Sequence, residues 1–442
     1  MAPGMVPPQH PGLGEAARLW ARIGCLSFGG PAAQIALMHR AVVEEKRWVG
    51  EARFLHALNF CMLLPGPEAQ QLATYLGWLL HGVRGGLVAG LLFILPGAAV
   101  MLGLSLLYAA LGAVPLVAAL FFGLQCAVLA LVLEALLKIA RRALHGPFAW
   151  GLAGLAFLGL FALHWPFPAV VAGAALLGAA WPAAFQRPTA PTQAAEAPAL
   201  IDHLLAAEPE RPARMARGAR RAGLVALALW LWPVALLRDV PLFGEIAWFF
   251  SRMAVVTFGG AYAVLAYVAQ EAVGHYGWLT PEAMLAGLGL AETTPGPLIL
   301  VLQFVGFMAG WPQGVLAALA TAGLALWVTF APCFAWIFLG APFIERLQAM
   351  PRLRGALAAV TAAVVGVIAN LALWFALRLV FRAQARLELG PFALELPVPG
   401  SLDPAALLLT LLAALALFRF RLGVLPLLGG SAAMGFFVKS ML

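Results

Sequence analysis

The chain has 442 residues, of which 63% are hydrophobic and only 10% are charged, and its mean hydropathy is +0.93. Soluble domains carry about 25% charged residues, so this composition excludes a soluble enzyme or binding module. A formal net charge of +8 would suggest nucleic acid as a partner of a soluble chain. In a membrane protein, however, basic loops follow the positive-inside rule. We therefore expect a lipid bilayer as the surroundings and no nucleic-acid partner.

The cysteines and histidines do not form a metal-binding or disulfide pattern. The four cysteines stand alone in apolar stretches, and the eight histidines include no pair at the i, i+4 spacing of a helical metal site. A Walker-type phosphate loop is also lacking. We expect neither a metal nor another cofactor.

Two apolar halves flank a polar stretch. We divide the chain into an N-terminal tail (1–13), a first membrane half (14–182), a linker (183–221) and a second membrane half (222–442). The linker is rich in Pro and Ala and contains six arginines. We expect it to be a mobile segment on the cytoplasmic side.

The first half opens with a helical segment that is too long for one span. As a single helix, Gly14–Val43 would extend roughly 45 Å, against a hydrocarbon core of about 30 Å, which favours a break at Gly29-Gly30-Pro31. Phe54–Leu64 and Ala69–Gly82 follow, joined by Pro65-Gly66-Pro67. Both pieces are too short to cross, so we expect a re-entrant hairpin with its turn near the middle of the bilayer.

The second half repeats these motifs. Phe28-Gly29-Gly30 recurs as Phe258-Gly259-Gly260, and Pro65-Gly66-Pro67 as Pro295-Gly296-Pro297, each 230 residues later. The loop after the first break carries four basic residues, whereas its counterpart, Gln270–Glu282, has none. This difference favours opposite orientations of the two halves. We predict an all-α polytopic membrane protein whose two homologous halves form an inverted repeat with re-entrant, discontinuous helices.

Other apolar runs predict further spans. Those next to the repeated motifs are Gly86–Tyr108, Leu116–Leu137 and Leu357–Leu377, whereas Met284–Thr294 and Leu298–Gly310 are the short pieces around the second Pro-Gly-Pro. Those expected outside the repeat are Phe148–His164, Phe167–Trp181, Gly223–Leu237, Pro404–Phe418 and Leu422–Val438. This topology leaves Arg378, Arg382 and Arg386 on the outer side, against the positive-inside rule.

The breaks could build an anion site. A helix that restarts after Gly-Gly or Pro-Gly-Pro presents free N–H groups and a partial positive charge. The alternative is that the glycines only allow close helix packing. The groups that we expect at a substrate site are Arg22, Gly29, Gly30, Gln34, Gly66, Glu68, Gln71, Arg252, Gly259, Gly260 and Gly296.

Two arginines occupy equivalent membrane positions. Arg22 and Arg252 each lie six residues before a Phe-Gly-Gly motif, with Glu15 and Glu245 two helical turns earlier. A membrane arginine costs at least about 2.5–3.5 kcal/mol, so we expect both to face the protein interior. The residues leave open whether they contact the substrate or form the ion pairs Glu15–Arg22 and Glu245–Arg252.

Three carboxylates are candidates for proton coupling. A carboxyl group buried in a membrane protein can carry a proton alongside the anion, and Glu68, Glu134 and Glu292 have such positions. For Glu68 the alternative is a structural one, because an acidic residue also stabilises a helix N-terminus.

Several strings in the chain resemble the chromate ion transporter family. The strings are Phe28-Gly29-Gly30-Pro31, Gln34-Ile35-Ala36, Glu44 to Trp48, Leu64 to Ala73, Gly82 to Gly86 and Phe93 to Gly97. The resemblance covers most of residues 15–145 and, more weakly, 243–380. It implies a multi-pass protein of the bacterial inner membrane that exports chromate, draws on the proton gradient and takes sulfate as a structural mimic.

The second half departs from the family pattern. Ala261 stands where the first half has Pro31, and Leu298 where it has Glu68, which argues against two equivalent sites. The alternatives are a transporter or channel for sulfate-like oxyanions and a membrane enzyme acting on lipid-linked phosphate. The sequence also leaves a homodimer open.

Overall fold

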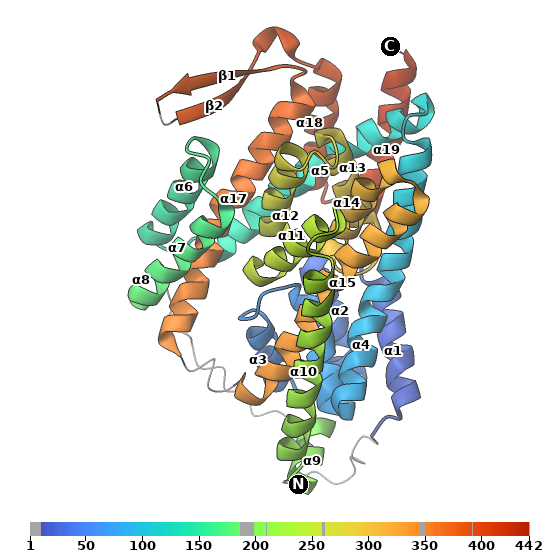
Figure 1. Cartoon of the computed structure of the whole chain (residues 1–442), viewed down its shortest axis with the longest axis vertical. Coiled ribbons are helices and arrows are strands. Elements are labelled where there is room, and N and C mark those ends of the chain that lie inside the picture. Colours follow the sequence, from blue (N-terminus) through green and yellow to red (C-terminus); the bar gives the residue numbers. More distant parts are fainter. Residues whose placement is uncertain are drawn as a thin grey trace.

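The computed structural model describes residues 10–441 except 186–198, 209, 259–260, 345–349 and 391. The described chain is almost entirely helical (Figure 1), which confirms the all-α polytopic class. Six of its helices are long and apolar enough to cross a membrane: Glu68–Leu111, Pro115–Ala143, Ala213–Leu236, Val315–Phe343, Pro351–Val380 and Val424–Met441.

The first helix is broken at the predicted glycines. α1 (Leu13–Leu26) ends before Ser27, and α2 (Gly30–His39) restarts three residues later. Gly29 and Gly30 have φ values of +84° and +78°, a region that favours glycine. In the second half, α11 (Phe243–Val256) and α12 (Ala261–Gln270) flank the equivalent position. Gly259 and Gly260 lie outside the described residues.

The two halves also share an irregular turn after the break. α2 and α12 each continue into a π-helical turn, η1 (Arg40–Glu45) and η2 (Glu271–His275). The N–H of Trp48 then donates to Val42 O, and the N–H of Trp278 to Ala272 O, both at 2.8 Å. The duplication seen in the sequence therefore extends to local backbone structure.

Each Pro-Gly-Pro turn joins two helices, and Gly66 and Gly296 adopt positive φ values of +121° and +90°. α4 contains a non-helical step at His81 and Gly82, so its first part is a short segment, as expected, and most of that segment is buried. The elements around the two turns are α3 (Glu51–Cys61), α4 (Glu68–Leu111), α13 (Pro281–Thr293), η3 (Leu298–Leu300), α14 (Val301–Gly310), η4 (Trp311–Gln313), α15 (Val315–Gly340) and η5 (Ala341–Phe343).

The long helices that follow the two turns run antiparallel. A Cβ on Gly86 would lie 2.8 Å from the ring of Phe338, and one on Gly90 would lie 2.5 Å from the ring of Phe334. The contact moves forward along α4 as it moves backward along α15, so the two chain directions oppose each other. Glycines on α4 leave the room that these aromatic rings occupy.

Helix pairs are exchanged between the halves. α6 (Pro147–Phe161) and α7 (Phe167–Ala180) follow α5 (Pro115–Ala143) in the chain but pack on α17 (Pro351–Val380). α18 (Pro404–Phe418) and α19 (Val424–Met441) follow α17 but pack mainly on α5. The expectation that these four spans lie outside the repeat is therefore wrong, because they occupy matching places in the two halves.

Small residues form matching contacts in the exchanged pairs. A Cβ on Gly178 in α7 would lie 2.2 Å from the carbonyl oxygen of Gly355 in α17. A Cβ on Gly435 in α19 would lie 2.5 Å from the backbone nitrogen of Gly123 in α5. In a bilayer, the lipid tails are as apolar as the helix surfaces, so the hydrophobic effect does not drive helices together. They associate instead through close packing of this kind.

The second part of the linker is helical. α8 (Pro182–Phe185), α9 (Leu200–Ala207) and α10 (Arg211–Leu236) cover most of its described residues. Leu200 and Ile201 are buried, and Asp202 forms an ion pair of 2.8 Å with Arg53. The expected mobility is thus wrong for this part, because α9 has an apolar side that docks on the first half. Residues 186–198 lie outside the described part.

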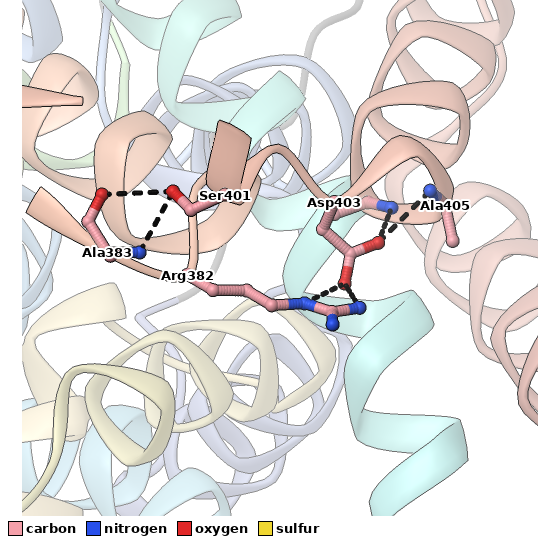
Figure 2. Close-up of polar contacts among 6 residues, drawn as sticks. Arg382, Ala383, Ser401, Asp403 and Ala405 are labelled. Atoms are coloured by element: carbon pink, nitrogen blue, oxygen red, sulfur yellow. Dashed lines mark hydrogen bonds and ion pairs between the residues drawn. The ribbon is translucent and has the colours of Figure 1, made fainter. Parts of the chain in front are cut away.

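A β-hairpin follows α17, which the sequence analysis did not anticipate. β1 (Gln384–Leu389) and β2 (Phe392–Pro397) pair antiparallel and lead through η6 (Pro399–Ser401) to α18. Figure 1 places the hairpin at the opposite end of the molecule from α9. At its base, Arg382 pairs with Asp403 at 3.0 Å and Ser401 bonds to the backbone of Ala383 (Figure 2).

Two of the three arginines that the predicted topology leaves on the outer side, Arg378 and Arg382, form ion pairs. Arg382 is bound by Asp403, which also caps α18 by accepting from the N–H groups of Ala405 and Ala406. Arg378 is bound by Glu395 of the hairpin at 2.8 Å. The ion pairs give Arg378 and Arg382 partners within the protein, whereas the conflict with the positive-inside rule stands, because that rule counts Lys and Arg and not net charge.

We predict that Gly178→Leu and Gly435→Leu each lower the thermal stability of the protein in detergent. The new side chain would overlap the backbone of the facing helix, and overpacking typically costs 1–3 kcal/mol or more. Gly173→Leu in α7 and Gly430→Leu in α19 are matched controls, because a Cβ there meets open space. Equal melting temperatures for the two sets would contradict the exchanged packing.

Candidate functional site

Each Pro-Gly-Pro turn is hydrogen-bonded to the broken helix of the opposite half. The N–H of Gly66 donates to the carbonyl oxygen of Thr257, at the end of α11, and the distance is 2.8 Å. The N–H of Gly296 donates to the carbonyl oxygen of Ser27, at the end of α1, at the same distance. Both members of one bond are 230 residues from their counterparts in the other. The four breaks therefore meet in crossed pairs.

Gln34 strengthens one of these crossings. Its side chain is 1% exposed, and Nε2 donates to Gly296 O at 2.6 Å and to Ser27 O at 3.3 Å. The equivalent residue of the second half is Val264, which has no such group. Gln34, expected as a substrate ligand, thus holds the second Pro-Gly-Pro turn against the first break.

The turns also pack on the kinked helices of the opposite half. A Cβ on Gly97, beside Pro96 in α4, would lie 2.0 Å from Pro295 O. A Cβ on Gly66 would lie 2.8 Å from Cys333 Sγ, beside Pro332 in α15. Nε2 of Gln71 closes the first turn by donating to Pro65 O at 2.7 Å. Glycine is needed at these positions because other segments approach them closely, which agrees with the alternative that the glycines allow close helix packing.

The N-terminus of α4 combines uncapped N–H groups with a carboxylate. Pro67 at the N-cap position makes no side-chain cap bond. The Glu68 carboxylate accepts a hydrogen bond from its own backbone N–H and lies within electrostatic reach of Arg142. The N–H of Gly66, expected to bind the anion, is instead engaged by Thr257. The N–H of Gln71 donates to Pro67 O at 3.1 Å as the first helical bond of α4, so the N–H groups of Ala69 and Gln70 are the ones that remain for a ligand.

The N-terminus of α2 lies at the protein surface. Gly29, Ala32 and Ala33 are exposed, Gly30 is half-buried, and Gly29 provides no side-chain cap. This end of the helix is therefore open to the surroundings of the protein, whereas the residues that follow Glu68 in α4 are buried.

The two arginines differ in orientation. Arg252 donates from Nη2 to the Tyr267 hydroxyl at 2.7 Å, and its Nε is buried without a partner. Arg22 is exposed, because the buried stripe of α1 consists of Ala16, Trp20, Ile23 and Gly24. The expectation that Arg22 faces the interior is therefore wrong.

The predicted ion pairs of these arginines do not form. Among the salt bridges of the described residues, Glu15 pairs with Lys46 at 2.9 Å, and none joins Glu245 to Arg252. Of the two arginines, the structure thus turns only Arg252 toward other polar groups of the protein.

Two of the three coupling candidates lie together. Buried Glu292 accepts a hydrogen bond from the Tyr262 hydroxyl, and Glu134 acts on Glu292 electrostatically. Glu134 in turn forms an ion pair of 2.7 Å with Lys138. Sequence reasoning missed Tyr262. The available signal was its position two residues after the second Gly-Gly, where the first half has Ala32.

Several buried amides around the turns have spare hydrogen-bonding capacity. The amide oxygens of Gln34, Gln70, Gln71 and Gln303 are buried without a partner. Unpartnered buried polar atoms are uncommon, and each costs free energy. The residues around the turns thus include four buried amides whose acceptor oxygens are unpartnered.

Comparison with known proteins shows which family the chain resembles in sequence. The chain matches the family described as chromate transporter over residues 14–179 and 244–436. It is 34% identical to the chromate transport protein of Pseudomonas aeruginosa, covering 78% of this chain and 77% of that protein. It is 28% identical to the probable chromate transport protein of Synechococcus elongatus, covering 82% of this chain and 84% of that one.

A further relative is the chromate transport protein of Cupriavidus metallidurans, which is 27% identical, over 78% of each chain. No solved structure matches the chain. The family match covers both membrane halves, including both Pro-Gly-Pro turns and the exchanged helix pairs. This chain belongs to the chromate transporter family.

Proposed function

We propose that this chain exports chromate across the inner membrane of a bacterium, using the proton-motive force. The proposal rests on membership of the family and on relatives that are named as chromate transport proteins. Because the family is one of transporters, the chain is not an enzyme, and the alternative of a lipid-phosphate enzyme falls away.

The observation that carries the mechanism is the crossed pair of hydrogen bonds, Gly66 to Thr257 and Gly296 to Ser27. Each bond ties a re-entrant turn of one half to the helix break of the other. In our proposal, opening toward one side of the membrane breaks one bond and keeps the other. Alternation between the two would give alternating access around a central site.

An inverted repeat makes such an exchange symmetric. The antiparallel contact of α4 with α15 supports this arrangement, because equivalent helices of the two halves run in opposite directions. The opposite charge pattern of the equivalent loops agrees with it. A two-fold axis in the membrane plane would then convert the inward-open form into the outward-open form.

We place the anion at the first turn of α4. Backbone N–H groups and the helix dipole favour an anion there, and Gln70, Gln71 and Thr74 add polar side chains. The equivalent turn of the second half, Leu298–Leu300, is apolar and buried. Gly259 and Gly260 lie outside the described residues and stay predicted ligands from the sequence alone.

Glu68 would couple the anion to protons. Its carboxylate occupies the N-terminus of α4 in competition with an oxyanion, since both bind the same N–H groups. Protonation of Glu68 removes the competing charge and lets the oxyanion bind. Glu292, with Tyr262 and Glu134, is a second group on a proton path.

A sulfate-like oxyanion is the second candidate substrate. Sulfate has the same tetrahedral shape and charge as chromate, and backbone N–H groups recognise both features without distinguishing the central atom. Counterflow of labelled chromate against sulfate in proteoliposomes would rank the two. A passive channel for these ions would show flux that does not respond to a pH gradient.

We predict that Glu68→Gln retains chromate binding and loses acceleration of chromate flux by a pH gradient. The amide of the new glutamine cannot ionise. Chromate therefore no longer competes with a carboxylate for the N–H groups of α4, and its binding no longer depends on the protonation of residue 68. Chromate flux into proteoliposomes with and without an imposed gradient measures this effect. Glu45→Gln, an exposed change in the same half, serves as the control. A gradient response as large as that of the wild type would contradict the role of Glu68.

A second prediction concerns the buried pair. We expect Glu292→Gln to slow gradient-driven transport by about tenfold or more, because a proton carrier is lost. Tyr262→Phe removes only the hydroxyl that donates to Glu292. We expect it to shift the pH at which transport is half-maximal while flux at the optimum stays near the wild-type level. Unchanged pH profiles in both variants would show that this pair has no part in coupling.

The arginines give a third prediction. We expect Arg252→Gln to lower chromate resistance of cells strongly and Arg22→Gln to lower it less, since only Arg252 is held among other polar groups. Expression levels of both variants should be matched by immunoblot. Full resistance in cells with Arg252→Gln would remove this arginine from the mechanism.

A further inference from the structure

A polar cavity lies at the hairpin end of the protein, apart from the crossed breaks. It has a volume of about 420 Å³ and lies between α12, α17, the α6–α7 loop and β2. The residues that give it chemistry are His164, Tyr267, Gln270, Glu271, Asn370, Arg378 and Glu395. Figure 1 shows the hairpin at the end of the molecule opposite α9.

Two hydrogen-bond donors in this cavity have no partner. Asn370 is 3% exposed, and its Nδ2 is buried without a hydrogen bond. Nη1 of Arg378 is likewise buried and unpartnered, and both residues line the cavity. A desolvated donor costs free energy unless a ligand or water satisfies it. Asn370 and Arg378 lie eight residues, or about two turns, apart on α17, and two such donors, one of them charged, suit an anion.

The guanidinium of Arg378 is held rigidly. Its Cζ lies 4.2 Å from the ring centroid of Trp374, and its Nη2 pairs with Glu395 at 2.8 Å. The ion pair ties β2 to α17 and holds Nη1 buried and unpartnered in the wall of the cavity. A rigid fork of donors recognises the oxygen atoms of a tetrahedral oxyanion better than a flexible ammonium does.

The carboxylates of the cavity already have partners. Glu395 is engaged by Arg378, and Glu271 faces the Tyr267 hydroxyl that also receives the hydrogen bond from Arg252. The two acidic residues therefore offset two arginines and leave the site weakly attractive to an anion. A weak site fits a transport path, because an ion that binds too tightly cannot leave.

We propose that this cavity is an outer binding site for a tetrahedral oxyanion, with Asn370 and Arg378 as its donors. The inference rests on the proposed function for the identity of the ion, while the site itself stands on the cavity and its two free donors. An exported anion would pause here between the central site and the outside.

The test measures equilibrium binding of labelled sulfate to the purified full-length protein in detergent, with chromate as competitor. We expect Asn370→Leu and Arg378→Gln each to weaken one class of sulfate site by about tenfold or more, the usual effect of losing a hydrogen bond to a charged group. Thr410→Val, a buried change in α18, is the control and should bind sulfate like the wild type.

Misfolding can be separated from loss of the site. Asn370→Leu removes an unpartnered donor, so its melting temperature should equal or exceed that of the wild type. Asn370→Asp keeps the shape of the side chain, replaces the donor with a carboxylate and should repel sulfate. Wild-type sulfate binding in stable Asn370→Leu and Asn370→Asp proteins would overturn the proposal. Loss of binding in these variants would support the site even if the wild type moved no chromate in proteoliposomes.

Discussion

The crossing of backbone hydrogen bonds between the halves is the constraint on which the rest of the structure depends. A helix that stops inside a membrane leaves N–H and C=O groups that water cannot satisfy, and each costs several kcal/mol if unpaired. Here the carbonyls at the ends of α1 and α11 are satisfied by the N–H groups of Gly296 and Gly66. Each of these hydrogen bonds joins one half to the other, so the broken helices are completed where the two halves meet.

The exchanged helix pairs also make each half depend on the other for its packing. α6 and α7 cover α17, while α18 and α19 cover α5, so each half encloses the central helix of the other. The contacts are made by glycines whose backbones touch, as between Gly178 and Gly355. Close backbone contact replaces the hydrophobic effect, which gives no preference for protein over lipid tails. A rigid frame of this kind can hold the two Pro-Gly-Pro turns in place.

The duplicated halves have diverged in chemistry while keeping their backbone. Beside the first Pro-Gly-Pro turn stand Glu68, Gln70 and Gln71, whereas Leu298–Leu300 follow the second. The polar groups of the second half lie at other positions, namely Glu292 with Tyr262 and the cavity of Asn370 and Arg378. One backbone plan thus offers different polar surroundings along a path, which a transporter needs if binding and release are to differ in strength.

The sequence by itself determined the membrane class, the duplication, the break at Gly29-Gly30 and the short helices around both Pro-Gly-Pro turns. These are local properties, because positive φ at glycine, the missing N–H of proline and apolar run length act within a few residues. Such rules also placed α18 at Pro404–Phe418, the range that the structure has.

Only the tertiary structure decided which break meets which turn, because hydrogen bonds such as Gly66 to Thr257 join residues far apart in the chain. It also decided that Arg22 is exposed at the protein surface, because the side of α1 that packs on α4 sets the rotation of that helix. The docking of α9, the β-hairpin and the exchange of helix pairs likewise depend on surfaces that form only when the halves come together. Pattern within a segment fixes its backbone, and the facing surface of another segment fixes where its side chains point.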